Sequence, residues 1–97
     1  MKNGKGYIKE YYYDSKLLFE GEYFNGLRNG KGKEYDFDGN LRFEGEYLNG
    51  KRNGKGKEYF KNKLIFEGEY LYGYKIKGKE FYENGKIKYD GEYHYDT

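Results

Sequence analysis

The chain has 97 residues, a length typical of one small domain. Its 19 basic and 17 acidic residues nearly balance, so the charge does not indicate a nucleic-acid-binding protein, and no direct nucleic-acid partner is expected. The absence of cysteine excludes a disulfide framework and thiolate chemistry. No apolar run is long enough for a signal peptide or a membrane span, which favours a cytoplasmic protein.

The composition favours an ordered protein made of β-strands. Charged residues make up 37% of the chain, a fraction that also suits disordered proteins, but the 23% of aromatic residues argues against disorder. The 16 glycines would destabilise helices, whereas the 15 tyrosines and the short alternating patterns are typical of strands.

Two short motifs recur along the whole chain. The motif F-E-G-E-Y begins at Phe19, Phe43 and Phe66, with a degenerate copy at Tyr89, so its spacing is 24 and then 23 residues. The motif K-E-Y, or K-E-F in its last copy, begins at Lys9, Lys33, Lys57 and Lys79. A period of this length indicates a repeat architecture.

Each repeat is predicted to form one β-hairpin of a single domain, residues 1–97. The repeats span about 7–26, 31–50, 55–73 and 77–95. The hairpins turn at residues rich in Asp, Asn and Gly, which favour turns: Asp14–Lys16, Asp38–Asn40, Asn62–Lys63 and Asn84–Lys86. We therefore predict an all-β fold, an elongated, single-layer, twisted antiparallel sheet in which consecutive strands form a meander.

The predicted register follows from the requirement that aromatic residues share one face of the sheet. A three-residue loop at 38–40 pairs Phe37 with Leu41, Tyr35 with Phe43 and Lys33 with Gly45. This register pairs Glu34 with Glu44 and predicts that every carboxylate of the repeats lies on the face opposite the rings.

Two strings carry a resemblance to a known family. FEGEYFNGLRNGKGKEY at 19–35 and FEGEYLNGKRNGKGKEYF at 43–60 resemble MORN repeats, and the spacing resembles the variant form found in antitoxin-like bacterial proteins. The chain departs from the commonest pattern in having Tyr where Trp is frequent and Lys-Glu after the last glycine. The resemblance implies an elongated sheet with an aromatic groove, and uses in scaffolding, partner binding or lipid binding.

The aromatic face is predicted to bind a protein partner, because a one-layer sheet leaves ring surface uncovered. The residues assigned to this groove are Tyr35, Phe43, Tyr47, Tyr59, Phe66 and Tyr70. An alternative interpretation is that these rings are simply the core of the sheet.

Basic residues near the turns suggest a second kind of contact, with anionic lipid headgroups at a membrane surface. The residues of this predicted basic edge are Arg28, Lys31, Lys51, Arg52 and Lys55. A solvated edge is the plainer interpretation. Two further alternatives are an inhibitor, antitoxin-like or immunity factor that binds a target enzyme, and a homo-oligomer formed through the exposed edge strands.

Catalysis has little support in the sequence. The chain has a single histidine, His94, a single serine, Ser15, and no cysteine, so no nucleophile, base and orienting group can be assembled. The carboxylates recur uniformly and lack a second ligand type, so neither a metal site nor a cofactor is expected. We predict that the protein is not an enzyme.

Overall fold

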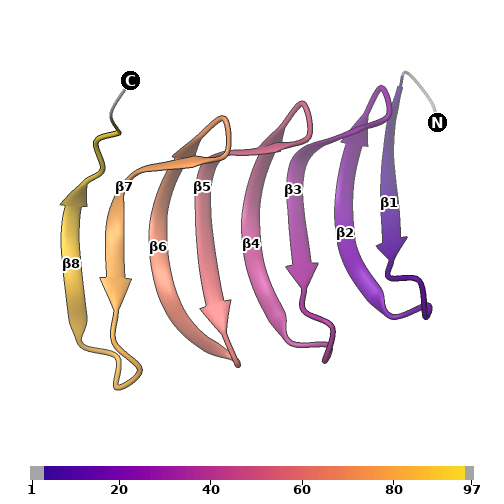
Figure 1. The fold of residues 1–97 in the computed structure, drawn as a ribbon. Coiled ribbons are helices and arrows are strands. Elements are labelled where there is room, and N and C mark those ends of the chain that lie inside the picture. The colour runs from indigo at the N-terminus through magenta and orange to yellow at the C-terminus, as the bar shows by residue number, and fades with distance from the viewer. Residues whose placement is uncertain (1–3, 96–97) are drawn as a thin grey trace.

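The computed structural model describes residues 4–95 and shows one open sheet of eight antiparallel strands (Figure 1). The strands are β1 (Lys5–Tyr11), β2 (Leu17–Phe24), β3 (Leu27–Tyr35), β4 (Leu41–Leu48), β5 (Lys51–Phe60), β6 (Lys63–Leu71), β7 (Tyr74–Phe81) and β8 (Ile87–Glu92). Each strand pairs with the next one along the chain, so the predicted all-β meander is confirmed. Residues 1–3 and 96–97 of the predicted domain lie outside the described range.

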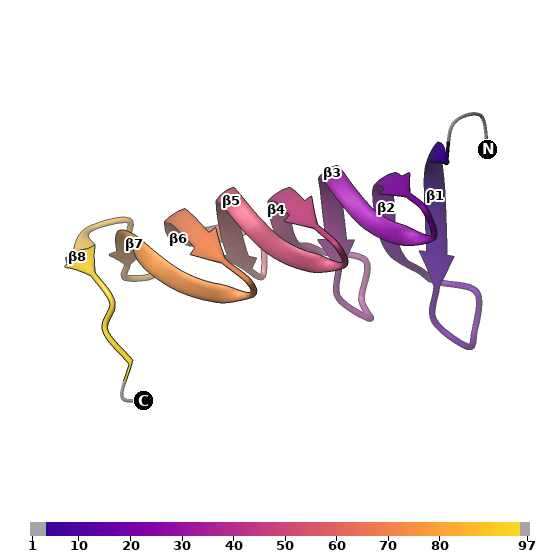
Figure 2. The same cartoon turned by 90° about the horizontal axis from the view of Figure 1, so that it is seen from above.

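The sheet is elongated, with principal extents of 42 × 32 × 21 Å. Strands β1 and β8 lie at opposite ends of the array, and the strands between them are curved and progressively rotated (Figures 1 and 2). No second layer of secondary structure covers either face within residues 4–95. The protein must therefore bury its apolar side chains within a single sheet.

The connections between hairpins depend on residues that accept a positive φ. Asn25 and Gly26 have φ of 50° and 84°, and Asn49 and Gly50 have φ of 49° and 87°. A two-residue connection with both φ values positive matches the twist of the strands on either side. The turn after β3 is held differently, because the Asp36 carboxylate accepts hydrogen bonds from two backbone N–H groups of the loop.

The predicted register is wrong by one residue. Gly32 pairs with Gly45, and Glu34 pairs with Phe43, whereas the prediction paired Lys33 with Gly45. The physical reason is a β-bulge after Glu34, which lets Tyr35 reach Leu41 across the hairpin. The same irregularity follows the equivalent glutamate in the other three hairpins, β1–β2, β5–β6 and β7–β8.

The corrected register changes which side chains share a face. Glu34 lies on the same face as Phe43, and the repeat places its equivalents there too: Glu10, Glu58 and Glu80. The prediction that all carboxylates oppose the rings is therefore wrong for these four residues. Tyr35 moves to the opposite face, as its hydrogen bond to Glu20 shows, and Tyr59 does the same with Glu44.

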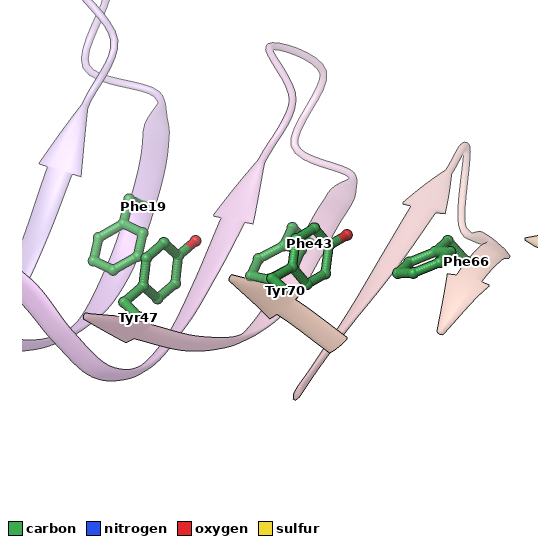
Figure 3. Packing of buried hydrophobic residues seen from close by; sticks show 5 residues of the cluster. All are labelled: Phe19, Phe43, Tyr47, Phe66 and Tyr70. Carbon is green, nitrogen blue, oxygen red and sulfur yellow. The ribbon is translucent and has the colours of Figure 1, made fainter. Parts of the chain in front are cut away.

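The core is a ladder of rings along one face, which we call the ring face (Figure 3). Its buried members are Phe19, Phe43, Tyr47, Phe66 and Tyr70. Rings of neighbouring hairpins meet edge to face, with centroids 5.3 Å apart for Phe19 and Tyr47 and 5.4 Å apart for Phe43 and Tyr70. This arrangement is the favoured one for aromatic pairs, and it links each hairpin to the next.

Glycine allows each phenylalanine ring to lie against bare backbone. A Cβ atom on Gly56 would lie 2.6 Å from Cε1 of Phe43 and 3.0 Å from Cε1 of Tyr70. Such contacts are shorter than packed atoms tolerate, so a side chain at this position would displace the ring. The row of paired glycines across the sheet is thus what lets a single layer bury its own core.

Candidate functional site: two faces of one sheet

Cationic side chains cover the outer side of the ring ladder. The guanidinium carbon of Arg28 lies 4.0 Å from the centroid of Phe19, and that of Arg52 lies 4.0 Å from the centroid of Phe43. In the third repeat the ammonium of Lys75 lies 4.4 Å from the centroid of Phe66. These cation–π contacts replace the second layer that the sheet lacks.

Each of these cations also pairs with a glutamate of the ring face. Arg52 Nε lies 3.1 Å from Glu34 Oε2, Arg28 Nε lies 2.8 Å from Glu10 Oε2, and Lys75 Nζ lies 3.0 Å from Glu58 Oε2. The hydroxyl of Tyr47 donates to Glu34, as the hydroxyl of Tyr23 does to Glu10. A carboxylate, a cation and a tyrosine hydroxyl thus form a polar unit in the first two of these sets, and the third set repeats the carboxylate and the cation.

The polar unit shifts the ionisation of its members. Burial opposes the charged form of Glu34, but the hydrogen bonds from Arg52 and Tyr47 outweigh it and hold the pKa of this carboxyl below its ordinary value. Burial and the hydrogen bond to Glu34 raise the pKa of the Tyr47 hydroxyl. The carboxylate of Glu34 is therefore charged at neutral pH and shared between two donors.

The burial of the rings changes the prediction of an accessible aromatic groove. Of its six residues, Phe43, Tyr47, Phe66 and Tyr70 are buried in the core, so the accessible aromatic groove is corrected to a closed ring ladder. The structure does not bring Tyr35 and Tyr59 to these rings, because both lie on the opposite face.

The structure places the five residues of the predicted basic edge in three different environments. Arg28 and Arg52 are held over the rings by the ring-face glutamates, so they are not presented to an outside surface. Lys51 lies at the turn between β4 and β5, paired with Leu48. Lys31 and Lys55 lie on the face opposite the rings, where they pair with Glu46 and Glu69.

The opposite face, which we call the polar face, carries alternating charges. Along one row, even-numbered strands present carboxylates and odd-numbered strands present lysines, so each interior charge of that row has opposite charges on both neighbouring strands. This row across the sheet consists of Lys9, Glu20, Lys33, Glu44, Lys57, Glu67, Lys79 and Asp90. Opposite charges on adjacent strands stabilise their pairing.

An open groove of about 800 Å³ runs across the polar face from β1 to β5. Its floor is the glycine row, and its walls are the charged side chains on both sides of that row. The lining residues are Tyr7, Glu20, Gly21, Glu22, Lys31, Gly32, Lys33, Glu44, Gly45, Glu46, Lys55, Gly56 and Lys57. A smaller hollow of about 310 Å³ continues this line over β6 to β8.

Two tyrosines of the polar face, Tyr35 and Tyr59, brace the wall of the groove. Tyr35 donates to Glu20 at 2.9 Å, and Tyr59 donates to Glu44 at 2.7 Å. Burial and these hydrogen bonds raise the pKa of both phenols to about 12. The carboxylates they contact are therefore held in fixed positions.

An apolar row lies beside the groove, at the end of the strands where the Asn-Gly turns are. It consists of Phe24, Leu27, Leu48, Leu71 and Tyr74, which are all exposed. Alternation along the strand places Phe24 on the same side as Glu22, and Leu48 on the same side as Glu46. The polar face thus combines a charged groove with an apolar rim.

The sequence analysis missed the ring-face glutamates and the role of the arginines. A signal was present, because Glu10 precedes Arg28 and Glu34 precedes Arg52 by the same 18 residues. Among residues 4–95, no three His, Asp or Glu side chains gather as metal ligands would. The same part of the chain contains no helix long and apolar enough to span a membrane.

Comparison with known proteins gives one match. The family model described as MORN repeat matches residues 19–41 and 43–64. Each match begins at a phenylalanine of the ring ladder and runs through the next hairpin connection. No curated protein and no solved structure matches the chain.

Proposed function

Because the chain is a MORN repeat protein that buries its own ring ladder, we propose that it binds a partner protein through the groove of its polar face. MORN repeats are commonly protein- or membrane-interacting modules, and the family is generally non-enzymatic. The proposal moves the contact surface from the rings to the face that remains accessible.

The observation that supports this proposal is the groove itself. Its floor is bare backbone, because the glycine positions face the ring ladder, so the main chain of a partner segment can approach the sheet between the charged walls. Charges of both signs line its walls at the strand spacing of about 4.8 Å. Such a surface favours an extended segment whose own charges alternate, because like charges brought opposite each other are penalised.

Tyr35 and Tyr59 support the same surface indirectly. Their hydroxyl groups hold Glu20 and Glu44, so the carboxylates need not be ordered when a partner binds. Preorganised groups lower the entropy cost of association. These two residues keep the role in partner binding that the sequence suggested, but as supports of the groove wall.

The proposal is tested by affinity capture with mass spectrometry. The groove variant carries Lys33→Glu and Lys57→Glu, and the matched control carries Lys61→Glu and Lys63→Glu, which makes the same charge change near the β5–β6 turn. We expect a protein retained by the wild type and the control but lost with the groove variant. Equal retention by both variants would remove the groove as the binding site.

A membrane surface is the second candidate, and the apolar row favours it. Lys5 pairs with Phe24 and Lys51 pairs with Leu48, so basic groups flank exposed apolar side chains. Sedimentation with anionic vesicles is the second arm of the same experiment. Binding that a Leu48→Asp and Leu71→Asp variant loses, and that the groove variant keeps, would favour the membrane.

A further inference from the structure

The polar unit of the ring face is assembled from three successive strands. An odd-numbered strand supplies the glutamate, the next strand supplies the ring, and the following odd-numbered strand supplies the cation. The sets are Glu10, Phe19 and Arg28; Glu34, Phe43 and Arg52; Glu58, Phe66 and Lys75. Each unit is therefore complete only when a strand pairs beyond the ring.

In the fourth unit, no strand of the described residues 4–95 lies beyond the ring. Glu80 accepts a hydrogen bond from Tyr93, as Glu10 does from Tyr23 and Glu34 from Tyr47, and Tyr89 stands in the place of the ring. Within residues 4–95, no cation lies in ion-pair distance of Glu80 or over the ring of Tyr89. Tyr89 is 41% exposed, whereas the three phenylalanines are fully buried.

On the polar face, the carboxylates of β8 likewise have a cation on one side only within residues 4–95. Asp90 pairs with Lys79 and Glu92 with Lys77, both on β7, and no strand within residues 4–95 pairs with the other side of β8. In the interior, Glu44 lies between Lys33 and Lys57. This edge of the sheet therefore presents Asp90 and Glu92 of β8 on the polar face and Glu80 of β7 beside Tyr89 on the ring face, and no further strand of residues 4–95 pairs with the backbone of β8.

The two edges of the sheet are not complementary to each other. On the odd-numbered strands the residue against the preceding ring is glycine, and a Cβ atom on Gly78 would lie 2.8 Å from Cε1 of Phe66. In β1 the same position is Ile8, which pairs with Gly21. A second copy that placed its β1 beside β8 in this register would bring Ile8 against Tyr89.

We infer that the free edge of β8 binds an extended, basic segment of another polypeptide, which adds to the sheet as a ninth strand. The segment has glycine opposite Gly91 and an arginine or lysine that reaches Tyr89 and Glu80. Further lysines pair with Asp90 and Glu92 on the polar face. This site is distinct from the groove over β1 to β5, although its Asp90 and Glu92 also line the smaller hollow over β6 to β8.

The chain itself provides the probe for this inference. A synthetic peptide of residues 50–60, which contains β5, has Gly56, Arg52 and the two lysines in the required places. Labelled peptide is titrated into the full chain and followed by fluorescence anisotropy, and amide chemical shifts locate the bound peptide. We expect saturable binding with shifts concentrated on β8.

Three variants test the individual contacts. A Gly56→Ile peptide imitates Ile8 and is expected to bind at least tenfold more weakly, because its side chain meets the ring of Tyr89. An Arg52→Gln peptide and a Glu80→Gln chain are each expected to lose about tenfold, since both remove the same charge-assisted contact. Combined, these two changes should cost no more than either alone.

Several results would overturn the inference. These are equal affinity of the unchanged and Gly56→Ile peptides, shifts on β1 in place of β8, or no binding up to the solubility limit of the peptide. The two peptide variants are measured on the unchanged chain, so a folding defect of the Glu80→Gln chain cannot decide the outcome.

Discussion

The two faces of this sheet use the same charged residue types with different consequences. On the ring face, Arg52 and Glu34 lie 3.1 Å apart with side chains 23% and 20% exposed, and the guanidinium covers Phe43. On the polar face, Lys57 and Glu67 lie 3.5 Å apart with side chains 46% and 47% exposed. The first pair completes the core, whereas the second is available to solvent and to partners. In a one-layer protein, a charged pair therefore stabilises the core when one of its side chains covers an aromatic ring.

The largest expected effect comes from removal of a ring. Phe43→Ala deletes a fully buried side chain that contacts Tyr47, Tyr70 and Arg52, and should cost about 3–5 kcal/mol of unfolding free energy. The matched control is Phe60→Ala, since Phe60 is 63% exposed and its loss should cost less than about 1 kcal/mol. Urea denaturation measures both. Similar losses for the two variants would show that the ladder is not the core.

An intermediate effect is expected from pH. The pKa values of Glu10, Glu34 and Glu58 are lowered in the folded protein, so these groups stabilise it above their unfolded pKa, and that stability is lost as the pH falls through the folded values. On the alkaline side, Tyr35 and Tyr59 have pKa values of about 12, above the ordinary 10. Their contribution is present below pH 10 and is lost as the pH rises to about 12.

Denaturation midpoints measured from pH 2 to pH 12 check this prediction. Stability should fall at both ends, and Tyr35→Phe should weaken the alkaline fall while the acid fall remains. A flat acid limb would contradict the assignment of ionised glutamates to the ring face.

Much of the fold could be predicted because the repeated motifs are visible in the amino-acid sequence. The spacing of Phe19, Phe43 and Phe66, with Asn-Gly or Asp-Gly between alternating segments, predicted eight strands in a meander, and the structure confirms them. Asn, Asp and Gly favour the backbone angles of turns, so their positions in the sequence indicate where the strands end.

The register and the site could not be predicted in the same way. The bulge after Glu34 requires no special residue, so nothing in the sequence distinguishes it from a regular strand. One missed bulge assigned Tyr35 to the face of Tyr47, although the two tyrosines look equivalent in sequence. The sequence left burial of the rings as an alternative to an accessible groove, and the structure bears out that alternative for Phe43, Tyr47, Phe66 and Tyr70; what the sequence did not show is that Arg28 and Arg52 cover the ladder.

The smallest expected effect tests the polar face directly. Lys57→Gln removes one exposed pair and should change the unfolding free energy by less than about 0.5 kcal/mol. Arg52→Gln, on the ring face, should cost about 2 kcal/mol, between the values for exposed and fully buried pairs, because it uncovers Phe43 and leaves Glu34 without its cation. Salt should shrink the first loss further and leave most of the second, since screening acts mainly on exposed charges. If Lys57→Gln proved as costly as Arg52→Gln, the lysines of the polar face would be part of the fold, and a surface reserved for a partner would have to lie elsewhere.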